Sequence, residues 1–314
     1  MSPPPEGPVA MVLAAGFGTR LRPLTEELPK PLVVVGDRSV LSHVCDTLAA
    51  GGVRRAVINA HHLAERYDGS LLESLALPVA MVQEHGEILG TAGGVAGARE
   101  ALGPGPVVVH NGDILATLDL ATLIAHQAAS GALATLAVGP SRGVGEGTVG
   151  LDDEGRVVRL RGHVFGRETR GADYAGVQVI AEAGRARLPR VGCLVGDVYI
   201  PALAEGGHVN AAEVVEAFSD VGTLEEYGEA NMSWLDRRGL PSWVAPDAEV
   251  VGSAQLDRTL VGARARVVGQ GRVRRCIVWP GATLEAPAFG IIATPSGARV
   301  PWKSDEARGA AAPR

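Results

Sequence analysis

The chain has 314 residues, which corresponds to about two domains of roughly 150 residues each. Apolar residues make up 46% and charged residues 20%, a balance that argues against disordered and fibrous proteins. Aromatic residues make up only 4%, too few for a platform that stacks single-stranded nucleic acid. The net charge is −6, so we expect neither nucleic acid nor a membrane as a partner, and an anionic ligand would need a local basic site.

The cysteines and the apolar segments indicate in which cellular compartment the protein is expected. Cys45, Cys193 and Cys276 are far apart, so we expect neither a disulfide framework nor a zinc site, and a reducing compartment, the cytoplasm. The apolar run Val9–Ala15 resembles a signal-peptide core. No Lys or Arg precedes it and it is short, so we interpret it as a buried strand. No run approaches the ~20 apolar residues of a membrane span.

The first part of the chain has an alternating pattern. After a proline-rich leader, residues 1–8, which we expect to be disordered, strand-like and helix-like runs alternate as far as about Gly139. This alternation predicts a mainly parallel sheet flanked by helices, with ligands beyond the carboxyl ends of its strands. The expected strands are Val9–Ala14, Ala56–Asn59, Val79–Gln83, Val107–His110 and Ala134–Val138, and the expected helices are Val40–Ala50, Leu63–Leu75, Val95–Ala101 and Leu120–Ser130.

The next part, from Thr148, favours short strands and then one helix. The sequence DDEGR between two strand candidates predicts a hairpin turn. Thr223 and Glu226 have the spacing of a capping box, which predicts a helix over Thr223–Arg238. We expect one catalytic domain over residues 9–238. Its later strands are expected at Thr148–Leu151, Val157–Leu160 and Tyr174–Ile180.

The last section has an apolar period of six residues. Such a period, with glycine nearby, is typical of hexapeptide solenoids, so we expect a short left-handed parallel β-helix over 243–302 and a disordered tail over 303–314. The alternative is an irregular glycine-rich tail. The positions six apart are Val244, Val250 and Leu256, then Val261, Val267 and Val273, then Val278 and Leu284.

A loop rich in small residues follows the first strand, in the sequence LAAGFGTRLRPLTEELPKPL (Leu13–Leu32). Small side chains let backbone N–H groups approach a phosphate. Arg20 offers a planar fork for phosphate oxygens, and Lys30 offers a point charge between two prolines. Two cations on such a loop fit a polyanionic substrate; the small residues are Ala14, Ala15, Gly16 and Gly18.

Other glycine-loop motifs fit this loop less well. Leu21 occupies the third glycine position of a Rossmann G-x-G-x-x-G fingerprint, and no P-loop motif is present. The remaining alternative is an ordinary tight turn with a solvated arginine and lysine.

The same segment resembles the signature of the sugar-1-phosphate nucleotidyltransferases, also called sugar-nucleotide pyrophosphorylases. Four further segments agree in order: EILGTAGGV resembles the base-recognition loop, VVVHNGDIL the metal-binding strand, TVGLDDEGRVV the sugar-side hairpin, and FSDVGTLEEYGEA the closing motif. The tail resembles that of mannose-1-phosphate guanylyltransferase-like members. The resemblance implies a Rossmann-like α/β nucleotidyltransferase domain followed by a short β-helix, with an NTP and a sugar 1-phosphate as substrates.

The resemblance also implies roles for particular residues. Asp113 and Asp220 would hold Mg²⁺, the expected cofactor, and Arg20, Lys30 and Asp113 would be catalytic. The nucleotide would be bound by Leu13, Ala14, Ala15, Gly16, Gly18, Thr19, Arg20, Glu84, Gly90 and Thr91, and the sugar phosphate by Lys30, Gly147, Arg161 and Gly176.

For two of these residues an alternative stays open. Glu84 could accept a hydrogen bond from a base N–H or be a solvated carboxylate. The expected sugar-phosphate lysine is missing after the hairpin, where VVRLRGHVFG offers Arg159 or Arg161 instead. The best fit is GTP with mannose 1-phosphate.

Three other functions compete with this one. The first is uridylyl or thymidylyl transfer to another hexose or amino-sugar phosphate. The second is a non-catalytic, sugar-nucleotide-binding regulator. The third is acyl transfer by the tail, which lacks the histidine base expected for that chemistry. The tail is expected instead to pack on the catalytic domain or to mediate homo-oligomers.

Overall fold

The computed structural model describes residues 7–303, so most of the predicted leader and tail lies outside the described residues. By contacts the chain forms two compact units. The first comprises Met1–Phe17 and Leu41–Ser219, and the second comprises Gly18–Val40 and Asp220–Arg314. In this grouping the loop with Arg20 and Lys30 and the helix after Asp220 belong with the tail. The expected catalytic domain over residues 9–238 stays a prediction.

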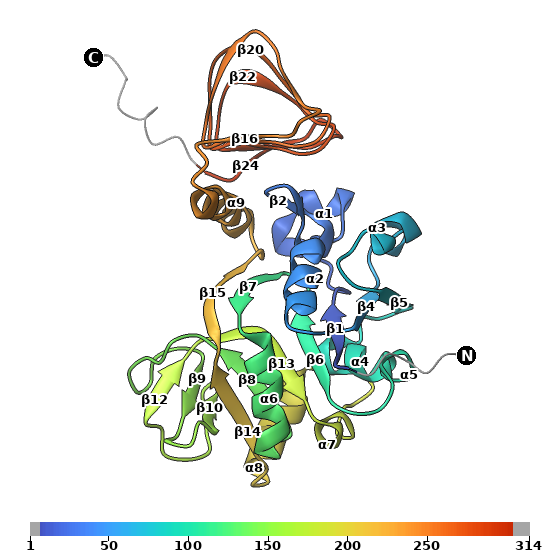
Figure 1. Cartoon of the computed structure of the whole chain (residues 1–314), viewed down its shortest axis with the longest axis vertical. Coiled ribbons are helices and arrows are strands. Elements are labelled where there is room, and N and C mark those ends of the chain that lie inside the picture. The colour runs from blue at the N-terminus through green and yellow to red at the C-terminus, as the bar shows by residue number, and fades with distance from the viewer. Residues whose placement is uncertain (1–6, 304–314) are drawn as a thin grey trace. The chain divides into compact units, whose positions relative to one another are not determined.

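The first unit contains a seven-stranded sheet in the order β14-β8-β13-β6-β1-β4-β5. Strands β1, β4, β5 and β6 run parallel, and β13 runs antiparallel to both of its neighbours. The expected mainly parallel α/β sheet is confirmed (Figure 1). Its strands are β1 (Val9–Leu13), β4 (Arg55–Ala60), β5 (Val79–Gln83), β6 (Val107–Asn111), β8 (Ala134–Val138), β13 (Tyr174–Ile180) and β14 (Val209–Glu213).

Helices and smaller sheets complete this unit. Helix α6 packs on β8, β13 and β14, and α4 and α5 pack on β1. The helices are α2 (Val40–Ala50), η3 (Ala64–Arg66), α3 (Gly69–Glu73), α4 (Gly90–Gly97), α5 (Arg99–Leu102), α6 (Leu120–Ser130), α7 (Glu182–Arg185), η4 (Leu194–Tyr199) and α8 (Ile200–Ala204). A four-stranded sheet contains β9 (Val149–Leu151), β10 (Val157–Leu160), β11 (His163–Val164) and β12 (Arg170–Ala172), and β7 (Ile114–Leu118) pairs with β15 (Val215–Asp220).

The core of the first unit lies along the central strands. Met11, Val57, Val109 and Leu136 are fully buried in one apolar cluster. Strands buried in this way need continuous apolar runs rather than alternation, and this is the pattern that the sequence has. The core thus fixes the carboxyl ends of β1, β4, β5 and β6 at one edge of the sheet.

In the second unit the loop after β1 joins helix α9 (Leu224–Arg238) and the tail. Thr223 caps α9, accepting a hydrogen bond from the Glu226 N–H at 3.2 Å, which is one half of the expected capping box. The unit begins with η1 (Thr19–Leu21), α1 (Leu24–Glu27), η2 (Lys30–Leu32), β2 (Val34–Val35) and β3 (Arg38–Ser39).

The tail is a stack of short parallel strands. Trp243 pairs with Leu260, and Leu260 pairs with Ile277, so each turn takes 17 residues. The outline of the stack has three sides (Figure 1). The strands are β16 (Trp243–Val244), β17 (Glu249–Val250), β18 (Ser253–Asp257), β19 (Leu260–Val261), β20 (Arg266–Arg274), β21 (Ile277–Val278), β22 (Thr283–Phe289), β23 (Ile291–Ala293) and β24 (Arg299–Pro301).

Buried and part-buried hydrogen bonds connect the tail with α9 and α9 with the segment 34–36. The Trp279 indole N–H donates to the Tyr227 hydroxyl at 2.8 Å, and this hydroxyl donates to the Val34 carbonyl at 2.6 Å. The Gly36 N–H donates to the Asn231 side chain at 3.0 Å. No helix within residues 7–303 is long and apolar enough to cross a membrane.

We expect Tyr227→Phe to lower the free energy of unfolding by about 1–3 kcal/mol, because it removes the partner of the buried Trp279 N–H and of the part-buried Val34 carbonyl. Tyr67→Phe is the control, since the buried Tyr67 hydroxyl has no hydrogen-bond partner in the described part of the chain. It should cost almost nothing. Urea unfolding of both variants checks this, and equal costs would contradict the prediction.

Candidate active site

The loop after β1 begins at the carboxyl edge of the sheet. The Ala14 N–H donates to the Asn59 side-chain oxygen at 2.8 Å, and the Gly112 N–H donates to the Leu13 carbonyl at 2.9 Å. Ala14 and Ala15 are buried. A Cβ at Gly16 would meet no atom within 4 Å. The first unit therefore presents open backbone at the point where the sequence predicts phosphate binding.

The loop over Glu87–Val95, which is predicted to recognise the base, is held against the segment 192–194. The Gly192 N–H donates to the Leu89 carbonyl, and the Ala92 N–H donates to the Gly192 carbonyl. A Cβ at Gly90, which has φ +75°, would lie 2.4 Å from that carbonyl oxygen. The Thr91 hydroxyl accepts from the Leu194 N–H at 2.8 Å. Gly90 and Thr91 are thus held in one place by backbone contacts.

Helix α4 starts at Gly90 and not at Val95, where the sequence predicted a helix to begin. The run Gly-Thr-Ala-Gly-Gly has low intrinsic helix propensity. Packing of its small residues on β1 and on the 190–192 backbone overrides that propensity, since a Cβ at Gly93 would lie 2.5 Å from the Arg190 carbonyl oxygen.

Glu84 is not a solvated carboxylate. It is 6% exposed, and its two oxygens accept hydrogen bonds from the Asn59 side-chain N–H at 2.6 Å and from the Leu89 N–H at 3.1 Å. A contact of Glu84 with a base stays a prediction. Asn59 contacts both Glu84 and the loop after β1, but it was not predicted as a site residue. The sequence shows it only as a polar residue near the end of an apolar strand.

Asp113 lies in the turn between β6 and β7. Gly176 approaches the same turn: it has φ +70°, and a Cβ there would lie 2.9 Å from the Asn111 side-chain nitrogen and 3.1 Å from Ile114. Only glycine fits this approach without strain. The structure thus brings two predicted residues, Asp113 and Gly176, to one turn. His110 nearby is buried, and burial lowers its pKa to about 4.

The structure separates the two candidate arginines. Arg159 donates to Glu168 at 2.7 Å and to the carbonyls of Gly147 and Glu146. It therefore holds the hairpin together. Arg161 has a left-handed backbone, φ +48°, and its guanidinium lies 3.7 Å from a Cβ built at Gly196. Arg159 is therefore occupied within the hairpin, which leaves Arg161 as the better candidate for binding a phosphate.

Cys193 lies beside Thr91 and Arg161. Partial burial raises the pKa of its thiol, but the N–H groups of Gly196 and Val195, the Thr91 hydroxyl and the Arg161 guanidinium together lower it below the usual value. Burial raises the pKa of Cys45 to about 12 and of Cys276 to about 11.

We therefore expect iodoacetamide at pH 8 to alkylate Cys193 at least ~10-fold faster than the other cysteines, because the thiolate is the nucleophile. Peptide mass spectrometry over time measures the three rates. Arg161→Ala should slow the reaction at Cys193. Preferential labelling of Cys45 or Cys276 would contradict this account.

In the second unit, the cations of the loop lie beside Asp220. The Lys30 ammonium is 3.6 Å from the Asp220 carboxylate, and the Lys30 side chain is only 10% exposed. A Cβ at Gly222 would lie 3.1 Å from Arg20 Nη2 and 3.1 Å from Asp220 Oδ1. The fold thus brings Arg20, Lys30 and Asp220 together, although Asp220 lies 190 positions after Lys30.

The turn at Gly18 sets the direction of this loop. Gly18 has a left-handed backbone, and its carbonyl accepts from the Thr25 hydroxyl at 2.9 Å. A Cβ there would lie 2.7 Å from Thr25 and 3.3 Å from Lys30. Only glycine allows this approach, so the G-x-G pattern shapes the backbone between the alanines and Arg20.

The residues present suit magnesium by their chemistry. No group of three or more His, Cys, Asp or Glu that could hold a metal occurs among residues 7–303. Mg²⁺ binds through one or two carboxylates and takes its other oxygens from water and phosphate. Asp113 of the first unit and Asp220 of the second each carry such a carboxylate, and their binding of Mg²⁺ stays a prediction.

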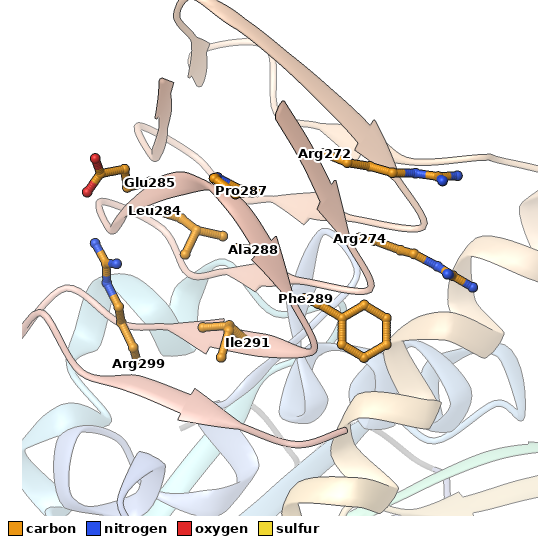
Figure 2. Close-up of a pocket in the computed structure, with 9 residues that line it drawn as sticks. All are labelled: Arg272, Arg274, Leu284, Glu285, Pro287, Ala288, Phe289, Ile291 and Arg299. Atoms are coloured by element: carbon orange, nitrogen blue, oxygen red, sulfur yellow. The ribbon is translucent and has the colours of Figure 1, made fainter. Parts of the chain in front are cut away.

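A cavity of about 470 Å³ lies on the tail, and none of the predicted site residues lines it. Its apolar part includes Leu284, Phe289 and Ile291, as Figure 2 shows. Two of its arginines already pair with Asp257. We assign this cavity no part in the reaction.

Comparison with known proteins identifies the family. Residues 9–161 match the family model described as nucleotidyl transferase. The chain is 30% identical over 307 residues to the mannose-1-phosphate guanylyltransferase of Mycobacterium tuberculosis, over 88% of this chain and 81% of that protein. This chain is a sugar-1-phosphate nucleotidyltransferase. The family expected from the sequence, and an enzymatic role, are thereby confirmed.

Two further similarities bear on this nucleotidyltransferase. It is 42% identical over 109 residues to the N-acetylmuramate α-1-phosphate uridylyltransferase of Caulobacter vibrioides, a match over 33% of this chain and 45% of that protein. Its fold resembles that of HddC from Yersinia pseudotuberculosis, with a TM-score of 0.58 and 21% identity over 72% of this chain and 99% of that one. This structural match supports the α/β nucleotidyltransferase fold.

Proposed function

We propose that the enzyme transfers guanylate from GTP to mannose 1-phosphate, giving GDP-mannose and pyrophosphate. One observation carries the catalytic assignment: Lys30, on the loop after β1, lies against Asp220, 190 residues later. An ordinary turn with a solvated arginine and lysine would not bury the lysine in this way. The choice of base and sugar is supported by the Mycobacterium tuberculosis relative, whose match spans most of both chains.

The reaction joins two anions. A phosphate oxygen of the sugar 1-phosphate attacks the α-phosphorus of the NTP, and the bond from that phosphorus to the oxygen of the β-phosphate breaks. Arg20 would hold the β- and γ-phosphates, and Lys30 would compensate charge near the reacting phosphates. Bound Mg²⁺, held by Asp113 and Asp220, would neutralise the triphosphate and the leaving pyrophosphate.

On the sugar side, Arg161 is proposed to bind the sugar phosphate, since Arg159 is occupied by Glu168 and two carbonyls. Gly147 and Gly176 are proposed to let backbone approach the sugar. A Cβ at Gly147 would lie 2.4 Å from the Ala172 carbonyl oxygen, so this turn is also tightly built.

A second candidate is uridylyl transfer to an amino-sugar 1-phosphate. The Caulobacter vibrioides relative supports it, with the higher identity over a shorter stretch. This alternative keeps the same reaction and changes only the base and the sugar.

We further propose that the tail is a short left-handed β-helix of hexapeptide type. Its 17-residue turns come close to three hexapeptides, and its strands pair in parallel. We propose a homo-oligomer through its exposed faces. A cytoplasmic location is supported by the free thiols.

The test is a matrix of GTP, UTP, dTTP and ATP against mannose 1-phosphate, glucose 1-phosphate and N-acetylmuramate 1-phosphate. Product NDP-sugar is measured by chromatography at fixed Mg²⁺. The proposal predicts the highest kcat/KM for GTP with mannose 1-phosphate. The highest value for UTP with N-acetylmuramate 1-phosphate would replace it with the second candidate.

A further inference from the structure

Three neighbouring parallel strands end in polar groups that contact one another. Leu13 of β1 pairs with Asn59 of β4, and Asn59 pairs with Val82 of β5. Beyond these pairs, hydrogen bonds run from the Ala14 N–H to Asn59, from Asn59 to Glu84, and from the Leu89 N–H to Glu84. We call Asn59 and Glu84 the relay. It connects the loop after β1 with the base-recognition loop.

The hydrogen bonds show which atoms of the relay donate and which accept. The Asn59 oxygen accepts from the Ala14 N–H at 2.8 Å, so its amide nitrogen donates to Glu84 at 2.6 Å. The other Glu84 oxygen accepts from the Leu89 N–H at 3.1 Å. Both partners of Glu84 are donors, so an amide at position 84 would set one N–H against another donor.

The relay is buried, and helix α4 covers it. Asn59 is 3% exposed and Glu84 is 6% exposed, so a lost hydrogen bond is not replaced by bulk water. Helix α4 covers the relay at Gly94, where a Cβ would lie 2.5 Å from the Asn59 amide nitrogen and 3.2 Å from a Glu84 oxygen. The missing side chain at Gly94 is what makes room for the relay.

We propose that Asn59 and Glu84 are positioning residues for the nucleotide. They hold the backbone at Ala14, which is expected beside the triphosphate, at a fixed distance from Leu89–Thr91, which are expected beside the base. Neither residue needs to touch the substrate for this role. The proposal rests on the proposed function, because it requires that an NTP contacts both loops. It adds that the buried pair Asn59 and Glu84 increases the affinity for NTP.

Exchanging the amide and the carboxylate between positions 59 and 84 tests this proposal. Asn59→Asp alone sets two carboxylates against each other, and Glu84→Gln alone sets two donors against each other. The double variant restores every hydrogen bond: the new carboxylate at position 59 accepts from the Ala14 N–H and from the new amide at position 84, whose oxygen accepts from the Leu89 N–H. The double variant also keeps one negative charge.

We expect each single variant to raise the KM for NTP and the calorimetric Kd for NTP about 10-fold, which is 1.4 kcal/mol, with a smaller change in kcat and in the KM for sugar phosphate. The double variant should return the NTP constants to within about 3-fold of the parent, as a coupled pair requires. Gly97→Ala is the control, because a Cβ there meets only the tip of Leu89 at 3.3 Å. Its NTP constants should match the parent's.

Thermal unfolding separates positioning from stability. Single variants that melt earlier but keep the parent's KM and Kd for NTP would overturn the proposal, and so would a folded double variant with NTP constants as poor as those of the single variants. If the single variants do not fold, the double variant decides alone. A parent that binds NTP but transfers to no sugar phosphate would refute the proposed function and leave the calorimetric test of the relay intact. A parent that binds no NTP would overturn both.

Discussion

Asp113→Asn and Asp220→Asn are each expected to lower kcat by at least ~10²-fold, the scale for losing one preorganised electrostatic element at a reacting centre. Each change removes one negative charge from a proposed Mg²⁺ ligand and keeps its size. The substitutions act in different units: Asp113 follows a buried strand, and Asp220 pairs with Lys30. Both variants should stay folded, because neither side chain belongs to the apolar core.

Titration with Mg²⁺ distinguishes a ligand from a merely nearby acid. Each variant should need a higher Mg²⁺ concentration for half-maximal rate than the parent. Asp153→Asn, at an exposed carboxylate in the hairpin turn, is the matched control and should keep the parent's curve. A variant at 113 or 220 with a near-normal rate in limiting Mg²⁺ would remove that residue from the proposed metal site.

Lys30→Ala is expected to lower kcat by about 10²-fold, with a smaller change in the KM for NTP, because an interaction that strengthens in the transition state appears in kcat. The lysine is buried, its backbone is preset by flanking prolines, and its ammonium lies 3.6 Å from Asp220. Lys30→Arg keeps the charge but not the compact shape, so it should retain part of the rate.

Steady-state kinetics, with NTP and sugar phosphate titrated separately, measure this prediction. Arg22→Ala is the control, since Arg22 is an exposed cation in the same segment, 4.0 Å from Glu26. A Lys30→Ala enzyme with unchanged kcat and a raised KM for NTP would mean that Lys30 only anchors substrate. An enzyme like the parent would make the assignment of this loop wrong.

The regular elements of the fold could be predicted because their signals are local. Helices α2 and α6 and strands β5, β8, β10 and β13 have the predicted bounds. Strands β7, β14 and β15 and the helical segment from Leu194 to Ala204 were not predicted. The three strands depend on pairing with strands that are distant in sequence.

The division into units could not be predicted from the change of period near residue 240. That change marks the start of the stacked strands of the tail, but contacts decide which segments pack together. Tyr227 of α9 bonds both Val34 and Trp279, and the Arg275 guanidinium pairs with Glu229. Such partners are far apart in sequence, and a single sequence contains no signal of their pairing.

The candidate site was predictable to the extent that its chemistry lies in one segment. Arg20 and Lys30 were found because cations on a small-residue loop suit phosphate. Glu84 was found only as a carboxylate near a loop, and Asn59 was missed. Their contact depends on three strands ending side by side and on Gly94 in a fourth segment, which only the fold supplies.

Nucleotidyl transfer is tested most directly by following the phosphates of the nucleotide. The enzyme is given mannose 1-phosphate and GTP with a radioactive label in either the α- or the γ-phosphate, and the products are separated. Attack on the α-phosphorus predicts that the α label appears in the nucleotide sugar and the γ label in pyrophosphate, in equal molar amounts and only with Mg²⁺ present. Release of the γ label as inorganic phosphate, with no label in a sugar nucleotide for any sugar 1-phosphate or NTP, would contradict nucleotidyl transfer by this protein.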